Sequence, residues 1–258
     1  MRDELLEKVR CAENLPTLPV VAVEILRLSR QDASVEELAG VIQQDPTLAA
    51  KLLKLVNSPL FGVRREVCSI KQAVSLLGLR TVKVMALSFS LVETIRNDQD
   101  SEFDFQTYWR RSLSTASTAR LLGKAIKSRV AEEAFVAGLL SDIGILAAWW
   151  TARDRYLPVL QARATDSEHL ATVELKMLGI SHAELGAAML RSWGLPEELC
   201  SAVVAHHGDT VDKNAESTTG ELSRIVHCAA TIADLFCQEL PPSQLDQIKA
   251  YCVDLTGI

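Results

Sequence analysis

The residues of this chain that could do chemistry are its histidines, and all five lie in the second half of the sequence. They are His169, His182, His206, His207 and His227. Neutral imidazoles and carboxylates that helices bring together are the usual donors of a metal site, because each contributes a lone pair. The sequence contains no H-E-x-x-H motif and no clustered Cys/His spacing. Spacing alone therefore leaves two interpretations open, a metal site and ordinary core or capping histidines.

The six cysteines are scattered and form no C-x-x-C pair. Most lie within apolar periodic segments, which is typical of buried free thiols in a reducing compartment. The opening segment, residues 1–8, is too charged for a secretory signal. No uninterrupted apolar run approaches the roughly 20 residues that a membrane helix needs. We therefore expect a cytoplasmic protein that is neither exported nor held in a membrane.

The charge of the chain bears on its partners. Its 258 residues carry a formal net charge of −6, which opposes broad attraction to a phosphate backbone. Residues 34–57 have the pattern of a helix-turn-helix, but the second helix carries only Lys51 and Lys54. Its apolar stripe is also broad enough to belong to a core. Nucleic-acid binding is disfavoured, and a DNA-binding regulator remains a weaker alternative.

A modest group of basic residues follows a turn predicted at residues 57–62. Such charges form either an anionic-ligand patch or, more often, a solvated face. The residues are Arg64, Arg65, Lys71, Arg80 and Lys83.

The elements that must position the histidines are predicted to be helices, because alternating β-branched segments are almost absent. Capping boxes at residues 34–37, 69–72 and 181–184 mark three helix starts. Residues 131–150 are apolar almost all round and predict one central buried helix. The polar segment 97–102 is predicted to connect two halves. We expect an all-α, two-lobed helical bundle with lobes at residues 1–100 and 101–258.

Several short motifs, in order along the chain, resemble the HDOD family, the HD-related output domains of bacteria. The resemblance covers nearly the whole chain and identifies the second lobe as HD-like. The motifs include LPTLP at 15–19, QDPTL at 44–48, LLKLVNS at 52–58, AGLLSDIG at 137–144, GISH at 179–182, WGLP at 193–196 and AHH at 205–207.

The resemblance implies a degenerate site. The HD superfamily holds metal with a histidine from one helix, a His-Asp pair from another and a later aspartate. Arg111 stands at the first histidine, Ser141 at the histidine of the pair, and Ala230 at the later aspartate. An arginine cannot be deprotonated, so it supplies a fixed positive charge and no lone pair.

What remains of the site is a polar pocket made of Asp142, His182, His206 and His207. With three donors lost, we expect no metal, no cofactor and no catalysis. Asp142 is expected to pair with Arg111 or to cap a helix. Asp234, one helical turn beyond Ala230, or His227 could restore a donor.

The function implied by the resemblance is a non-catalytic bacterial signal-transduction module. It would act through contacts with a protein partner such as a sensor, a kinase or a cyclic-dinucleotide enzyme. The first alternative is a residual metal-dependent phosphohydrolase acting on a nucleotide or cyclic dinucleotide. The second is the DNA-binding regulator.

Overall fold

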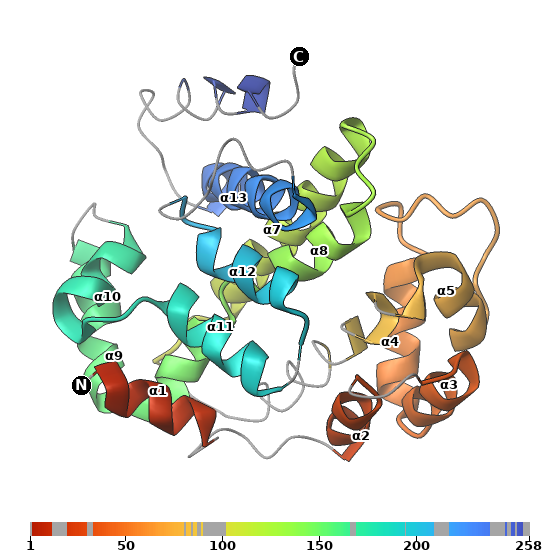
Figure 1. Ribbon diagram of the computed structural model, residues 1–258, viewed down its shortest axis with the longest axis horizontal. Helices are drawn as coiled ribbons and strands as arrows, with labels where there is room; N and C mark the ends of the chain where they lie inside the picture. Colours follow the sequence, from red (N-terminus) through yellow and green to blue (C-terminus); the bar gives the residue numbers. More distant parts are fainter. Residues whose placement is uncertain are drawn as a thin grey trace. The chain divides into compact units, whose positions relative to one another are not determined.

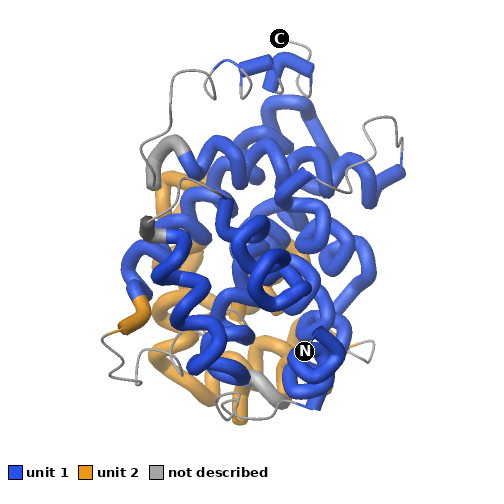
Figure 2. The backbone as a smooth tube through the Cα atoms, turned by 90° about the vertical axis from the view of Figure 1, so that its left-hand side faces the viewer, with its two compact units in different colours: residues 1–15, 104–258 blue, residues 16–103 orange. Residues whose placement is uncertain are grey.

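The fold is all-α, as the sequence predicts. The computed structural model describes residues 2–11, 20–29, 33–79, 81–83, 85–86, 89, 102–165, 169–193, 195–208, 217–237, 246, 249–250 and 252–254. Within these residues every regular element is a helix and none is a strand (Figure 1). The chain forms two compact units (Figure 2): unit 1 is Met1–Leu15 with Asp104–Ile258, and unit 2 is Pro16–Phe103.

Unit 2 contains α2 (Val20–Ser29), α3 (Val35–Gln43), α4 (Pro46–Val56) and α5 (Ile70–Leu77). The starts of the last three are capped by residues of their own sequence. Ser34 and Glu37 complete the predicted capping box of α3. Asp45 caps α4 by accepting from two backbone amides, with Pro46 as its first residue. At α5 the Ser69 hydroxyl caps as predicted, but the Gln72 side chain accepts from the Cys68 amide instead of the Ser69 amide.

Unit 1 contains the helices that carry the histidines. They are α1 (Arg2–Arg10), α7 (Phe105–Ala125), α8 (Ala131–Leu140), α9 (Ile143–Thr165), α10 (Leu170–Leu178), α11 (His182–Ser192), α12 (Glu197–Ala205) and α13 (Thr218–Cys237). Helix α7 packs on α8 and α13, α11 packs on α9 and α12, and α12 packs on α13. The helices that supply the pocket therefore share one core.

The single helix predicted over residues 131–150 is wrong in one respect. Helix α8 ends at Leu140 and α9 begins at Ile143, so Ser141 and Asp142 form a junction between them. The reason is tertiary, because α9 begins directly against the backbone of α11. A Cβ on Gly144 would lie 1.9 Å from the His182 carbonyl oxygen.

The stretch Ala131–Arg163 is long and apolar enough to cross a membrane, but 94% of its most apolar part is buried inside the protein. The apolar character of α8 and α9 is thus used within the core of unit 1.

The lobe boundary at residues 100/101 stays a prediction, and the second compact unit ends at Phe103. The predicted connecting segment, residues 97–102, falls mostly outside the described residues. The structure differs at the other end of the chain, because α1 belongs to unit 1. Leu5 and Val9 are buried in this helix, which packs against α9 and α11. Apolar burial, not chain order, thus decides where α1 belongs.

Candidate functional site

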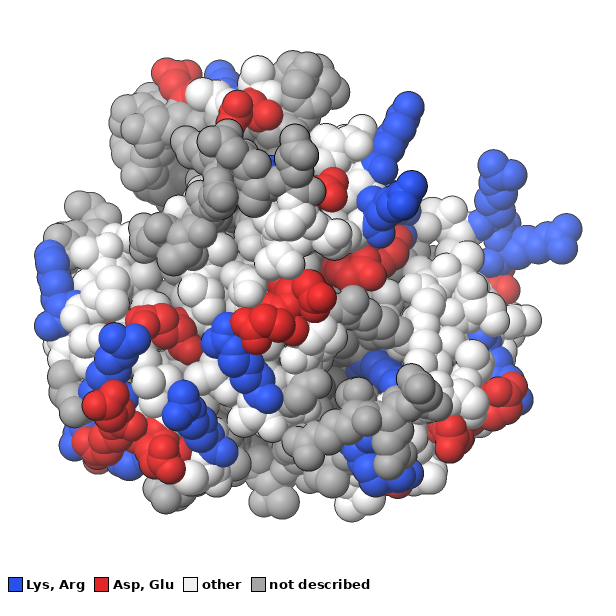
Figure 3. Space-filling model, in the orientation of Figure 1, with Lys and Arg blue, Asp and Glu red and all other residues white. Residues whose placement is uncertain are grey.

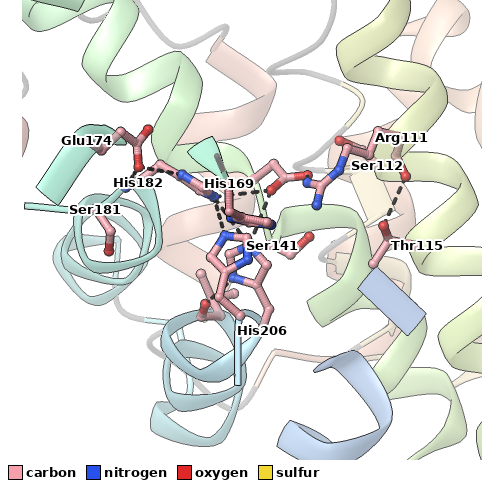
Figure 4. A network of polar contacts seen from close by, with 12 residues as sticks. Arg111, Ser112, Thr115, Ser141, His169, Glu174, Ser181, His182 and His206 are labelled. Carbon is pink, nitrogen blue, oxygen red and sulfur yellow. Dashed lines mark hydrogen bonds and ion pairs between the residues drawn. The ribbon is translucent and has the colours of Figure 1, made fainter. Parts of the chain in front are cut away.

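Four of the predicted pocket residues meet inside unit 1. Asp142 lies at the α8–α9 junction, His182 is the first residue of α11, and His206 and His207 follow the last turn of α12. Their side chains offer ligand atoms that all lie within 4.8 Å of one another. Figure 4 shows the network that surrounds them. The close approach of α9 and α11 at Gly144 is what brings Asp142 to His182.

The contact distances define a small polar centre. Asp142 Oδ1 lies 3.4 Å from His182 Nε2 and 3.3 Å from His206 Nε2. The two Nε2 atoms are themselves 3.3 Å apart, and His207 Nε2 lies 2.7 Å from His182 Nε2. Within the described residues, Asp142 Oδ1 is buried and has no hydrogen-bond partner. Ring nitrogens and a carboxylate oxygen thus converge on one point.

The orientation of His182 is set by a buried carboxylate. His182 Nδ1 donates to Glu174 Oε2 at 2.6 Å, and the backbone amide of His182 donates to the same oxygen at 2.7 Å. The Tyr156 hydroxyl donates to the other oxygen, Glu174 Oε1, at 2.5 Å. Tyr156 of α9 and Glu174 of α10 therefore hold the His182 ring with its Nε2 directed into the polar centre.

The orientation of His206 follows from its backbone contact. His206 Nδ1 lies 2.6 Å from the Val203 carbonyl oxygen. Because a carbonyl can only accept, Nδ1 carries the proton. In the neutral ring the lone pair is then on Nε2, which faces Asp142.

Arg111 of α7 lies between two carboxylates. Its Nη1 donates to Asp142 Oδ2, and its Nε donates to Asp234 Oδ1 of α13 at 2.9 Å. Burial alone would lower the pKa of this guanidinium, but Asp142 and Asp234 raise it. Burial would likewise raise the pKa of Asp142, yet Arg111 and the neighbouring histidines hold it well below its usual range. An Arg-Asp ion pair thus occupies one side of the pocket.

The histidines divide into two electrostatic classes. Burial lowers the pKa of His182, but Glu174 and Asp142 overcome this effect and raise it to about 9. Burial lowers the pKa of His206 although Asp142 opposes this effect. Burial, with repulsion from the neighbouring rings, places the pKa of His207 well below its ordinary value. Two ring nitrogens 2.7 Å apart need a proton between them, so His182 donates and His207 accepts.

The other predicted site residues lie at the edge of this centre or outside it. Ser141 is buried, and its hydroxyl donates to the Gly138 carbonyl at 3.0 Å. Ala230 is buried in α13 and has no donor atom in its side chain. His227 Nδ1 contacts the His206 carbonyl at 2.9 Å. Asp234 pairs with Arg111 and does not join the four converging donors.

The described members of the predicted basic group in unit 2 differ in their surroundings, and the patch stays a prediction. Arg64 and Arg65 are exposed, whereas Lys71 lies 3.5 Å from Glu36. Lys83 is buried and donates to the Leu28 carbonyl at 2.8 Å. Arg80 lies outside the described residues. On the face shown in Figure 3, basic and acidic side chains of the described residues are interspersed.

The spacing of the histidines does not point to Glu174 or Tyr156, although Glu174, together with the GISH segment at 179–182, is among the residues that resemble the HDOD family. A signal for Glu174 exists, because it shares a helical stripe with Ala171 and Leu178, which are both buried. A carboxylate on a buried stripe requires a partner. Tyr156 gives no such signal, since aromatic residues are often buried without a polar role.

The fold and the pocket define an all-helical, HD-related domain. The HDOD domain family matches residues 15–208, and the chain belongs to this family. An uncharacterised protein of Treponema pallidum is 26% identical over 197 residues, which are 76% of this chain and 38% of that protein. This chain thus spans less than half of that relative's length.

Solved structures share the fold. An HDOD domain protein of Geobacter sulfurreducens has a TM-score of 0.75 at 23% identity, covering 99% of this chain and 89% of its own. A protein of Shewanella amazonensis described as a candidate phosphohydrolase has a TM-score of 0.73 at 26% identity, covering 99% and 88%. The response regulator MmoQ of Methylococcus capsulatus has a TM-score of 0.52 at 33% identity, covering 93% and 94%. The chain is therefore similar both to a signalling protein and to a phosphohydrolase-like one.

Proposed function

We propose that this chain is a cytoplasmic regulatory module that binds a signalling protein, such as a sensor, a kinase or a cyclic-dinucleotide enzyme, and does not hydrolyse phosphodiesters. The observation that carries the proposal is Arg111 between Asp142 and Asp234. A guanidinium there holds both carboxylates in ion pairs at any physiological pH, because arginine keeps its proton. Those carboxylates are then not free to bridge the pair of metal ions that a two-metal displacement uses.

Burial of the pocket supports the same proposal. Asp142, His182 and His206 are each only 1% exposed. Hydrolysis needs an open position for an activated water and access for the phosphate group. A pocket this closed favours a structural or recognition role over turnover.

The family membership supports a signalling role. MmoQ, with which this chain shares 33% identity over 93% of its length, is a response regulator. HDOD domains host varied roles on one architecture, so the family indicates signalling more firmly than it indicates a ligand.

A metal-dependent phosphohydrolase is the second candidate, and one observation favours it. Four donors lie within 4.8 Å of one another, and a 26% identical relative is described as a candidate phosphohydrolase. This candidate predicts turnover that depends on an added divalent ion and disappears when Asp142 is replaced.

A hydrolysis assay separates the two candidates. The purified chain is incubated with Mg²⁺, Mn²⁺ or Zn²⁺ and with nucleotides, cyclic dinucleotides and bis(p-nitrophenyl) phosphate. We expect no product above a matched blank without protein. Metal-dependent product that is lost in the Asp142→Asn variant contradicts the proposal.

The binding half of the proposal needs its own test. The tagged chain is used to capture proteins from a bacterial lysate, and mass spectrometry identifies them. We expect a sensor, kinase or cyclic-dinucleotide enzyme that rebinds the chain when both are pure. Failure of every captured signalling protein to rebind argues against a protein-binding module.

A further inference from the structure

We propose that Asp142, His182, His206 and His207 bind one divalent transition-metal ion of the zinc class, and that Glu174 positions His182 for this role. The inference goes beyond the proposed function, because it gives a ligand to a module that needs no turnover. It also departs from the expectation, drawn from the missing HD donors, that the pocket holds no metal.

The separations of the donor atoms fit a single tetrahedral shell. Metal–nitrogen bonds of about 2.1 Å place the donors of a regular tetrahedron about 3.4 Å apart. The three distances among Asp142 Oδ1, His182 Nε2 and His206 Nε2 are 3.3, 3.3 and 3.4 Å. His207 is closer to His182, at 2.7 Å, so an ion that takes the place of the intervening proton requires a small outward shift of the His207 ring.

A buried oxygen that makes no hydrogen bond, and only longer contacts to two imidazole rings, provides a further reason for a cation here. Asp142 Oδ1 has no hydrogen-bond partner within the described residues, although its residue is only 1% exposed. Buried carboxylate oxygens are normally paired or bound to a metal, because leaving one unsatisfied is unfavourable. This oxygen is directed at the same point as the Nε2 atoms of His182 and His206.

The donor chemistry selects the class of ion. Three imidazole nitrogens and one carboxylate oxygen suit zinc, cobalt or nickel, whereas magnesium and calcium prefer shells of oxygen. A shell filled by four protein donors is typical of structural zinc, since a catalytic zinc keeps a position for water. The chemistry of the donors is thus compatible with a pocket that does not hydrolyse.

Arg111 limits the site to one ion. It binds Asp142 Oδ2, the oxygen that a second ion would need, and it also holds Asp234. A permanently charged guanidinium beside the first ion repels another cation.

Glu174 acts on the ion through His182. By accepting from Nδ1, it fixes the tautomer whose Nε2 lone pair faces the centre, and Tyr156 holds Glu174 in turn. A carboxylate behind a ligating histidine orients the ring and raises its basicity. Loss of such a partner typically lowers metal affinity about 10- to 100-fold.

The test measures metal binding without reference to activity. The whole chain carries Cys11→Ser and Cys68→Ser, because these two thiols are exposed and could bind zinc themselves. After removal of metal with a chelator, it is dialysed against Zn²⁺ and its metal content is measured by mass spectrometry. The absorption spectrum of the Co²⁺ form reports the coordination geometry. We expect one ion per chain and an intense tetrahedral Co²⁺ spectrum.

Variants assign the ligands and the positioning residue. Replacing His182 or His206 by alanine should abolish binding, and Glu174→Gln should weaken it about 10- to 100-fold. Tyr156→Phe, a milder change, should weaken metal binding less. Circular dichroism checks that each variant is folded. The matched control is Glu132→Gln, which disturbs the buried Arg120 ion pair elsewhere in unit 1 and should leave metal affinity unchanged.

Several results would overturn the inference. They are a chain that retains no zinc after loading, two ions per chain, and a folded His182→Ala variant that binds like the parent. Equal affinity in the folded Glu174→Gln and parent proteins removes the positioning role. Absence of metal together with absence of turnover refutes this inference alone, whereas turnover with metal bound refutes the proposed function.

Discussion

Arg111 and His182 supply positive charge to the same aspartate in different ways. The arginine is charged at every physiological pH, whereas the histidine can lose its proton. Asp142 lies between them, with Oδ2 paired to Arg111 and Oδ1 facing His182. The residue thus combines a permanent partner with an adjustable one.

Arg111, the permanently charged partner of Asp142, should matter most for stability. Replacing Arg111 by methionine removes the one guanidinium that the buried carboxylates of Asp142 and Asp234 share. We expect the free energy of unfolding to fall by about 3 to 5 kcal/mol, the usual effect of breaking a buried ion pair from one side. Urea denaturation of the metal-free protein measures it. The Arg111→Met, Asp234→Asn double variant should recover part of the loss, and a double variant no more stable than the single one contradicts the explanation.

His182, the partner of Asp142 that can lose its proton, should make stability depend on pH. The pKa of His182 is raised to about 9 in the folded chain, against about 6.5 in an unfolded chain. The stabilisation is fully present below pH 6.5 and is lost as pH rises through 9. Between pH 6.5 and 8, before thiols ionise, we expect this contribution of His182 to fall by about 1.5 kcal/mol. The lowered pKa values of His206 and His207 act in the opposite direction, because these rings take up a proton more easily in the unfolded chain. In urea denaturation of metal-free protein, the change in stability from pH 6.5 to 8 should therefore be more positive in His182→Gln than in the parent by about 1.5 kcal/mol, and the same as in the parent in His227→Gln.

The pocket was only partly predictable from its residues. Asp142, His182, His206 and His207 are identified by motif resemblance, and all four meet in space. The support from Tyr156 could not be predicted, because it depends on α9 and α10 packing together across 18 residues of sequence. The contact between Arg111 and Asp234 could not be predicted either, because it depends on how α7 and α13 pack together.

At the scale of elements, the important contact is between α9 and α11. Gly144 and Gly186 allow these helices to approach until backbone meets backbone, since a Cβ on Gly144 would lie 2.6 Å from the Gly186 amide nitrogen. Asp142 immediately precedes α9, and His182 begins α11. The glycine contact therefore sets the distance between two pocket residues.

Adding one methyl group should disturb that contact. We expect Gly144→Ala to lower the free energy of unfolding by about 3 kcal/mol or more, because its Cβ would meet backbone atoms that cannot rotate away. Gly40→Ala is the matched control, since a Cβ on this exposed residue of α3 would meet nothing within 4 Å. That change should stabilise by about 0.5 to 1 kcal/mol through helix propensity. Thermal denaturation of the two variants compares them, and similar behaviour would contradict the packing argument.

Element boundaries were predictable where they depend on neighbouring residues. The capping boxes at Ser34 and Ser181 are local and are present as predicted. The break between α8 and α9 depends on contact with α11, and composition gives no sign of it. Local chemistry thus specifies helix starts, whereas tertiary contacts decide where an apolar stretch divides.

At the scale of the whole molecule, α1 joins a unit whose other residues begin at Asp104. Leu5 is fully buried in α1. Arg2 and Glu4 also reach unit 1 through exposed ion pairs with Glu184 and Arg155. Apolar burial should dominate this attachment, because exposed ion pairs contribute little.

Substitutions in α1 should therefore act at a distance along the chain. We expect Leu5→Ala to cost about 2 to 5 kcal/mol in the stability of unit 1, and Arg2→Ala less than about 1 kcal/mol. Hydrogen–deuterium exchange followed by mass spectrometry shows which helices are destabilised. Exchange should increase in α9 and α11 for Leu5→Ala while α3 to α5 keep their protection, and uniform change in both units would count against this division.

The attachment of α1 has a consequence for the order in which the protein is made. The ribosome completes α1 at Arg10, but α11 begins only at His182. At about 5 to 20 residues per second, this interval is on the order of ten to thirty seconds. The apolar side of α1 lacks its complete set of final neighbours throughout that time, because α9 ends at Thr165 and α11 follows it. A nascent chain of this protein therefore exposes α1 to chaperones well before the pocket residues of α11 and α12 have been made.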